Sequence, residues 1–152
     1  MVTISIRQPW VWWIERGWKT TEAKSHKRLR WLAGRRVAIH AGKFIDMKAI
    51  RMALPYLSEP QMQETIMSFN DALKKPVRQE FDDPRFGAVL FTAELMDFRR
   101  LTFDDNQDTL WDSHGLYGFS IENLEMLKYP IPWKGSINVF HVPDELIIHD
   151  KG

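Results

Sequence analysis

The chain of 152 residues contains no cysteine. Disulfide bonds, thiolate nucleophiles and cysteine-ligated metal sites are therefore excluded, and the composition suits a reducing compartment. The sequence has no apolar run near the roughly 20 residues that a membrane-spanning helix needs. Its first residues show no basic stretch followed by an apolar one. We therefore expect a cytoplasmic protein with no signal peptide and no membrane contact.

The composition is that of a folded globular protein. Hydrophobic residues make up 44% of the chain and charged residues 27%, which separates it from disordered sequences. The sequence contains no repeat, low-complexity tract or linker, so residues 1–152 are expected to form a single domain. Four of the seven tryptophans fall between Trp10 and Trp18. Their large apolar rings suit both a core and a base-stacking surface.

Charge is distributed unevenly along the chain, although the net charge is only +1. Residues 15–51 hold 11 Lys or Arg against three Asp or Glu, whereas residues 52–152 hold nine against 17. Such a chain can present a basic face on a nearly neutral body. Basic faces bind polyanions because phosphate contacts release counterions. A solvated surface of uneven charge is the alternative interpretation.

Stretches rich in β-branched or alternating residues predict extended segments. These segments are residues 3–7, 19–25, 35–41, 87–101, 117–122, 129–133 and 137–142. Loops are expected at residues 27–36, 74–85 and 103–114. Strands and helices do not alternate regularly. The pattern therefore favours an α+β fold with a mixed, mostly antiparallel, curled or barrel-like sheet.

A short N-terminal helix is predicted after Pro9, which suits a first helical position. Trp10, Trp13 and Ile14 fall at helical spacing and predict its buried stripe. Gly17 follows, and we expect it to end the helix in a left-handed backbone conformation.

A helical insert is predicted at about residues 45–74. Within it, Ser58 and Gln61 have the spacing of a capping box, with Pro60 in the first turn. The apolar residues that follow at helical spacing predict its core-facing stripe. They are Met62, Ile66, Phe69 and Leu73.

Five short motifs occur in order along nearly the whole chain. They are residues 5–10 (SIRQPW), 17–24 (GWKTTEAK), 37–43 (VAIHAGK), 115–119 (GLYGF) and 130–135 (PIPWKG). Together they resemble the ASCH family of the PUA-like superfamily, whose signature reads Gly, any, Lys, two of any, Glu, any, Arg. Lys24 stands where that signature prefers arginine, and lysine cannot make the planar bidentate contact of arginine.

The resemblance implies a PUA-like β-barrel with a cleft between the barrel and the first helix, lined by Lys19, Glu22 and Lys24. Family members are described as candidate RNA-binding or coactivator-type domains. Relatives include amidohydrolases acting on acetylated cytidine and readers of modified bases in DNA. The resemblance therefore implies that the partner is RNA, another single-stranded nucleic acid or a modified nucleoside, with no cofactor.

Charged side chains are the first binding candidates. Lys19 and Lys24 would contact phosphate while Glu22 accepts a hydrogen bond from a base, provided that the chain turns between Lys19 and Glu22. The alternative is a surface ion pair of little energetic weight. Arg7 in the opening motif and Lys43 at the end of the segment 35–41 are further candidate phosphate contacts.

The other binding candidates are His40, Trp18 and Tyr117. His40 points away from its neighbours in the segment 35–41 and is either a structural residue or a hydrogen-bonding, acid/base group at the cleft. Trp18 and Tyr117 offer rings on which a base can stack, with core packing as the alternative.

Two charged clusters have separate interpretations. The basic run at residues 27–36 surrounds Trp31, a combination that suits single-stranded nucleic acid or a solvated loop. The acidic segment 103–114 lacks the glycine and the terminal glutamate of a calcium loop, so it is interpreted as a solvated loop and no metal site is predicted.

Three functions remain open from the sequence. A nucleic-acid-binding module accounts for the charge asymmetry and the aromatic residues, and is preferred. A hydrolase, either a ribonuclease or an amidohydrolase, would use Lys19, Glu22 or His40 as its catalytic groups. The threonine nucleophile of the related amidohydrolases falls on Glu22 here, which argues against that chemistry. A protein-interaction domain would use the acidic part of the chain and the helical insert.

Overall fold

A computed structural model describes residues 1–74 and 83–151. Within them, one sheet contains the strands β1 (Val2–Gln8), β2 (Thr21–Lys24), β3 (Arg35–Ile45), β4 (Ala88–Arg100), β5 (Tyr117–Pro132) and β6 (Phe140–His141). The strand order is β2-β5-β4-β3-β1-β6. β1 and β3 run parallel, and the other neighbouring pairs run antiparallel. The prediction of an α+β fold with a mixed, mostly antiparallel sheet is confirmed.

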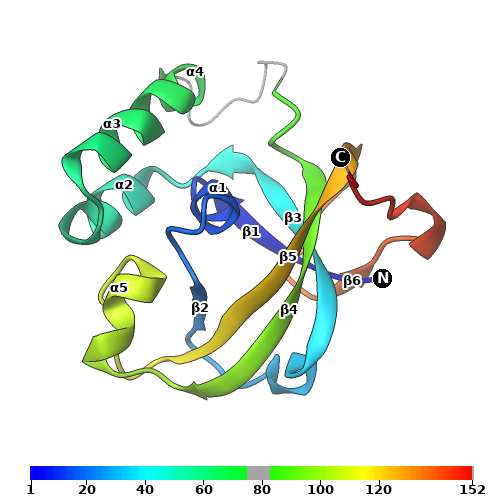
Figure 1. The fold of residues 1–152 in the computed structure, drawn as a ribbon, viewed down its shortest axis with the longest axis horizontal. Coiled ribbons are helices and arrows are strands. Elements are labelled where there is room, and N and C mark those ends of the chain that lie inside the picture. Colours follow the sequence, from blue (N-terminus) through cyan, green and yellow to red (C-terminus); the bar gives the residue numbers. More distant parts are fainter. Residues whose placement is uncertain (75–82, 152) are drawn as a thin grey trace.

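The sheet is curled but does not close into a barrel (Figure 1). Its edge strands β2 and β6 each pair with one strand only among the described residues. The short helix that follows β1 lies beside β1 and the carboxyl-terminal end of β3 (Figure 1). That arrangement positions the cavities described below.

Five α-helices lie in the described residues. They are α1 (Trp10–Glu15), α2 (Met47–Ala53), α3 (Glu59–Ser68), α4 (Asn70–Lys74) and α5 (Asn106–Thr109). α2, α3 and α4 gather on one side of the molecule, away from β6 and the amino terminus (Figure 1). Measured over the described part of the chain, every helix is too short or too polar to cross a membrane.

The first helix is buried on all sides. Trp10, Trp13 and Ile14 are buried as the spacing predicts, and Gly17 has a left-handed φ of 78° at the end of the helix. Trp12 is buried as well, because the ring of Phe69 packs edge-on against it at a centroid distance of 5.6 Å. α1 is therefore held between the sheet and the helical insert.

The helical insert confirms the predicted cap and corrects the predicted stripe. The Ser58 hydroxyl accepts a hydrogen bond from the backbone N–H of Gln61, and the Gln61 side chain accepts one from Ser58. Ile66, however, is 45% exposed, while Thr65 is fully buried. The Thr65 hydroxyl donates to the carbonyl of Gln61 and accepts from the indole N–H of Trp13. These two bonds satisfy the buried hydroxyl of Thr65. The apolar pattern predicts no buried polar group at this position.

Several predicted boundaries are wrong. β3 continues to Ile45 because Gln8 pairs with Ile45 and extends the ladder past Gly42. β5 joins the predicted segments 117–122 and 129–133 into one long strand beside β4. Of the predicted segment 137–142, only Phe140–His141 pairs as a strand. The predicted loop 74–85 lies mostly outside the described residues.

The acidic segment 103–114 is more ordered than a solvated loop. It contains α5 and a 3-10 turn, and Asp105 and Asn106 in it are buried. The Asp105 carboxylate accepts a hydrogen bond from the backbone N–H of Thr102 and pairs with the guanidinium of Arg99. These interactions lower the pKa of Asp105, the Thr102 bond most strongly. The segment thus stabilises the fold beside β4.

Candidate functional site

Two cavities meet at the carboxyl-terminal half of β1. The larger has a volume of about 810 Å³ and the smaller about 300 Å³. Ser5, Ile6 and Arg7 line both cavities. One strand therefore separates two pockets of different chemistry.

The small cavity contains the signature residues Lys19, Glu22 and Lys24. The chain turns before Lys19, at residues 16–18, and β2 begins at Thr21; all three side chains line the same space. From the sequence, they could also have lain on opposite faces of an extended strand. The structure brings the three side chains together without a turn at residues 20–21.

Lys19 is buried, with 1% of its surface exposed. Its Nζ donates to the carbonyl of Thr109 at 2.9 Å and lies 3.5 Å from a carboxylate oxygen of Glu22. The same ammonium lies 4.9 Å from the ring centroid of Trp10, within cation–π range. Burial lowers the pKa of Lys19, and the attraction of Glu22 opposes that shift. The weak surface ion pair considered from the sequence is therefore wrong, because both partners are buried.

Two further residues that line the small cavity, Trp10 and Asp46, are also hydrogen-bonded within the protein. The Trp10 indole N–H donates to a carboxylate oxygen of Asp46 at 2.9 Å. The other oxygen of Asp46 accepts from the backbone N–H of Lys48 at the start of α2. The sequence prediction omits Asp46 as a site residue and places it inside the helical insert, whereas the structure makes it the cap of α2. Lys24 and Arg7 make no ion pair within the part of the chain that the structure describes.

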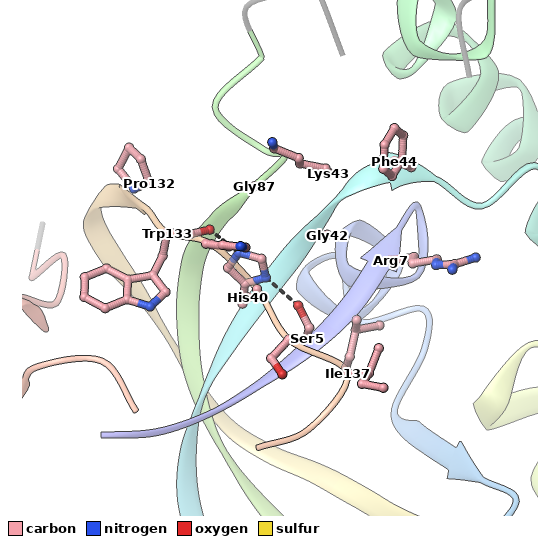
Figure 2. Close-up of a pocket in the computed structure, with 14 residues that line it drawn as sticks. Ser5, Arg7, His40, Gly42, Lys43, Phe44, Gly87, Pro132, Trp133 and Ile137 are labelled. Carbon is pink, nitrogen blue, oxygen red and sulfur yellow. Dashed lines mark hydrogen bonds between the residues drawn. The ribbon is translucent and has the colours of Figure 1, made fainter. Parts of the chain in front are cut away.

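His40 is held in the floor of the large cavity between two oxygen atoms (Figure 2). The parallel register of β1 and β3 places Ser5 opposite His40. The Ser5 hydroxyl lies 2.5 Å from Nδ1 of His40, and Nε2 lies 2.7 Å from the carbonyl oxygen of Trp133. A carbonyl can only accept, so Nε2 carries the proton and Nδ1 accepts from the hydroxyl of Ser5 in the neutral ring.

Burial lowers the pKa of His40, and the hydrogen bond to Trp133 opposes the shift. The ring is 1% exposed and therefore neutral near pH 7. His40 is hydrogen-bonded on both ring nitrogens and also lines a cavity, while its role as an acid/base group stays a prediction.

The walls of the large cavity combine apolar groups with cations. Phe44, Pro132, Trp133 and Ile137 supply the apolar surface. Three cationic side chains also line the cavity, and they are Arg7, Lys43 and Lys134. None of these three makes an ion pair or a side-chain hydrogen bond with a residue that the structure describes, and none of the described lining residues is Asp or Glu. The cavity therefore has an uncompensated positive charge.

Gly135 packs directly against the pair formed by Ser5 and His40. A Cβ atom at this position would lie 2.5 Å from Cε1 of His40 and 2.7 Å from the Ser5 hydroxyl. Real side chains do not approach that closely, so the segment 133–137 can cross the floor of the cavity only because residue 135 is glycine.

Two predicted binding residues lie outside both cavities. Trp18 packs edge-on against Trp12 at 5.3 Å, with the Arg16 guanidinium 5.2 Å from its ring. Tyr117 stacks on Phe98 at 5.9 Å, and its hydroxyl accepts from Arg100. Both rings are therefore engaged with neighbours away from the cleft.

The basic run at residues 27–36 is only partly available to a ligand. Arg36 donates to Thr92 and lies within ion-pair distance of Glu94 and Glu125. The Arg35 guanidinium lies 5.4 Å from the ring of Trp31 and donates to its carbonyl. Across residues 1–74 and 83–151, no group of three or more His, Cys, Asp and Glu side chains is arranged to hold a metal ion.

Sequence reasoning missed three groups at the large cavity: Ser5, the carbonyl of Trp133 and the side chain of Lys134. All three lie in recognised motifs, but their meeting depends on the β1–β3 register and on the path of residues 133–137. No local sequence pattern predicts that these three groups come together.

The sequence matches no protein-family model, and no curated protein is significantly similar to it.

Proposed function

We propose that this protein is a nucleic-acid-binding domain with a PUA-like, ASCH-type fold, and that it holds one nucleotide of a single strand, preferably RNA, in the large cavity. The observation that supports this function most strongly is the lining of that cavity: three unpaired cations around an apolar space with no carboxylate among the described residues. An anionic ligand with an apolar, planar part would satisfy both features.

The size of the cavity fits such a ligand. At about 810 Å³ it lies inside the range of roughly 300–1,000 Å³ typical of small-molecule sites. The exposed ring of Phe44, which lines the cavity, offers a face on which a base can stack (Figure 2). A base can enter the cavity only when it is unstacked, so a single strand or a free nucleoside suits the site better than a duplex.

Phosphates would lie along the cationic rim. Arg7 and Lys43 extend from neighbouring strands on one side of the cavity, and Lys134 belongs to the segment that crosses it. Lys24 and Arg7 continue this positive rim into the small cavity. A strand that follows the rim would therefore release counterions at several positions.

The experiment is a fluorescence anisotropy titration with a labelled single-stranded RNA at low and moderate salt. We expect binding to weaken with salt, and Arg7→Ala, Lys43→Ala and Lys134→Ala each to weaken binding and to reduce the slope of log K against log salt by about 0.7. Lys128→Ala is the matched control, since Lys128 is an exposed cation outside both cavities.

Two outcomes would contradict the proposal. The first is binding that Lys128→Ala weakens as much as the cavity variants do, which would indicate a general surface attraction. The second is the absence of RNA binding at low salt. Titration with nucleoside monophosphates would then show whether the cavity accepts a free or modified nucleoside. A denaturing gel of the same samples detects cleavage, which would identify a ribonuclease.

A further inference from the structure

The contact between Ser5 and His40 has the elements of an activated nucleophile. Ser5 is half-buried and lines both cavities, whereas His40 is buried beneath it. The hydroxyl lies 2.5 Å from Nδ1, and the opposite ring nitrogen is held by the carbonyl of Trp133 at 2.7 Å. A hydroxyl, a base within hydrogen-bond reach and a third group that orients the base are the parts of a serine nucleophile.

We propose that Ser5 is a nucleophile that His40 activates, and that the large cavity hydrolyses carboxylic esters of anionic molecules. This activity does not rest on nucleic-acid binding. Its substrate class follows from the lining of the cavity, where Arg7, Lys43 and Lys134 attract a negative group and the apolar walls accept the remainder.

The reaction has two balanced steps. In the first, Ser5 Oγ bonds to the acyl carbon while its proton passes to Nδ1 of His40. The tetrahedral intermediate then expels the alcohol, which takes that proton from His40. In the second, water attacks the acyl-serine and gives a proton to Nδ1. The acid leaves as Ser5 Oγ departs and recovers its proton.

Backbone groups near Ser5 are suited to stabilise the oxyanion. Lys134 and Gly135 line the cavity, and their N–H groups donate to no acceptor among the described residues. Gly135 also lies against the Ser5 hydroxyl. Unpaired backbone donors beside a nucleophile are the usual parts of an oxyanion hole.

The group that orients His40 determines how fast we expect ester hydrolysis to be. The carbonyl of Trp133 fixes the tautomer of His40, as a carboxylate does in a serine protease, but it carries no full charge to stabilise the imidazolium. We therefore expect slow turnover and a readily trapped acyl-enzyme.

The first test is labelling with a fluorophosphonate probe, followed by trypsin digestion and mass spectrometry. We expect the label on Ser5, in the peptide of residues 1–7. Ser5→Ala should abolish it, and Ser25→Ala, which changes an exposed serine outside both cavities, should not. Failure to label, or a label that persists in Ser5→Ala, would overturn the proposal.

The second test compares hydrolysis of p-nitrophenyl acetate with that of the p-nitrophenyl monoester of succinic acid. Ser5→Ala should reduce kcat/KM at least about 100-fold. The anionic ester should be preferred about fivefold, and Arg7→Ala or Lys43→Ala should reduce that preference. Equal rates for the wild type and Ser5→Ala would overturn the assignment.

The third test uses the absence of cysteine, because Ser5→Cys introduces the chain's single thiol. Alkylation by iodoacetamide should have its pH midpoint at least about one unit below that of Ser25→Cys, since His40 takes the thiol proton and the resulting imidazolium stabilises the thiolate. His40→Asn in the same background should remove the difference. A midpoint at or above that of Ser25→Cys would overturn the proposed role of His40, whatever the outcome of RNA binding.

Discussion

The two cavities share β1 but handle charge in opposite ways. In the small cavity, the ammonium of Lys19 is buried, bonded to Thr109 and paired with Glu22. In the large cavity, the cations are exposed and have no partner among the described residues. The comparison suggests that the buried pair of the small cavity stabilises the fold, whereas the cations of the large cavity, with Lys24 beside them in the small one, are unsatisfied groups with which a ligand can interact.

The largest expected effect would come from breaking the buried pair. Lys19→Met leaves the Glu22 carboxylate buried without its cation and should lower the free energy of unfolding by about 3–5 kcal/mol. Adding Glu22→Gln removes the orphaned charge and should restore much of that loss. Urea unfolding of both variants measures the effect. A loss below about 1 kcal/mol for Lys19→Met would show that the pair is not structural.

Crowding the floor of the large cavity should have the next largest effect. Gly135→Ala would place a methyl group against His40 and Ser5, and the segment 133–137 would have to move. Overpacking of this kind destabilises by about 1–3 kcal/mol. Gly42→Ala is the matched control, because the nearest atom to its Cβ would be Cγ of Arg7 at 3.7 Å. Thermal unfolding should separate the two variants, and equal Tm values would show that the close approach of Gly135 does not constrain this segment.

A smaller effect on stability is expected from the protonation of His40 as pH changes. The pKa of His40 is lowered in the folded state, so the unfolded state binds the proton more readily. Stability should therefore be complete above the ordinary histidine value near 6.5 and fall as pH decreases below it, by at most about 1.4 kcal/mol per pH unit. Urea unfolding between pH 5 and 8 measures this slope. His40→Asn should flatten it, and His141→Asn, at an exposed histidine, should not.

The contribution of the small cavity to the free energy of unfolding should also rise with pH, but over a different pH range. The lowered pKa of Lys19 implies that the unfolded state holds this proton up to the ordinary value of 10.5. Stability attributable to Lys19 should therefore rise with pH between the folded-state pKa and 10.5. Comparison of the wild type with Lys19→Met at alkaline pH measures it, and a contribution from Lys19 that falls as pH rises would contradict the assignment.

The smallest effect on stability is expected at the rim of the large cavity. Lys43 is exposed and unpaired among the described residues, so Lys43→Ala should change the free energy of unfolding by less than about 0.5 kcal/mol. Urea unfolding checks this value beside that of Lys19→Met. A loss comparable to that of Lys19→Met would show that the two cavities do not differ as proposed.

The sequence predicted most of the local structure. Trp10, Trp13 and Ile14 indicated a buried helix face, and Ser58 with Gln61 indicated a helix start, because these patterns depend on residues within one or two turns. The prediction for Ile66 was wrong because the position of a helix against its neighbours depends on what those neighbours offer. Here Trp13 supplied a partner for the hydroxyl of Thr65.

The candidate site was predictable only in part. The spacing in residues 17–24 left open whether Lys19 and Glu22 share a face, the family resemblance implied one cleft for them, and the structure brings them into one cavity. Trp18 and Tyr117 had the right chemistry for stacking but lie elsewhere, because aromatic side chains serve a core equally well.

The sequence by itself determined an α+β chain with its short first helix, its helical insert and its excess of cations before residue 52. Tertiary structure alone decided which charges of the described residues are paired and which are free. It also decided that Ser5, His40 and Trp133 meet, since they are brought together by strand register and by a glycine-dependent crossing. Local patterns report neighbours along the chain, whereas a site of this kind depends on contacts between distant segments.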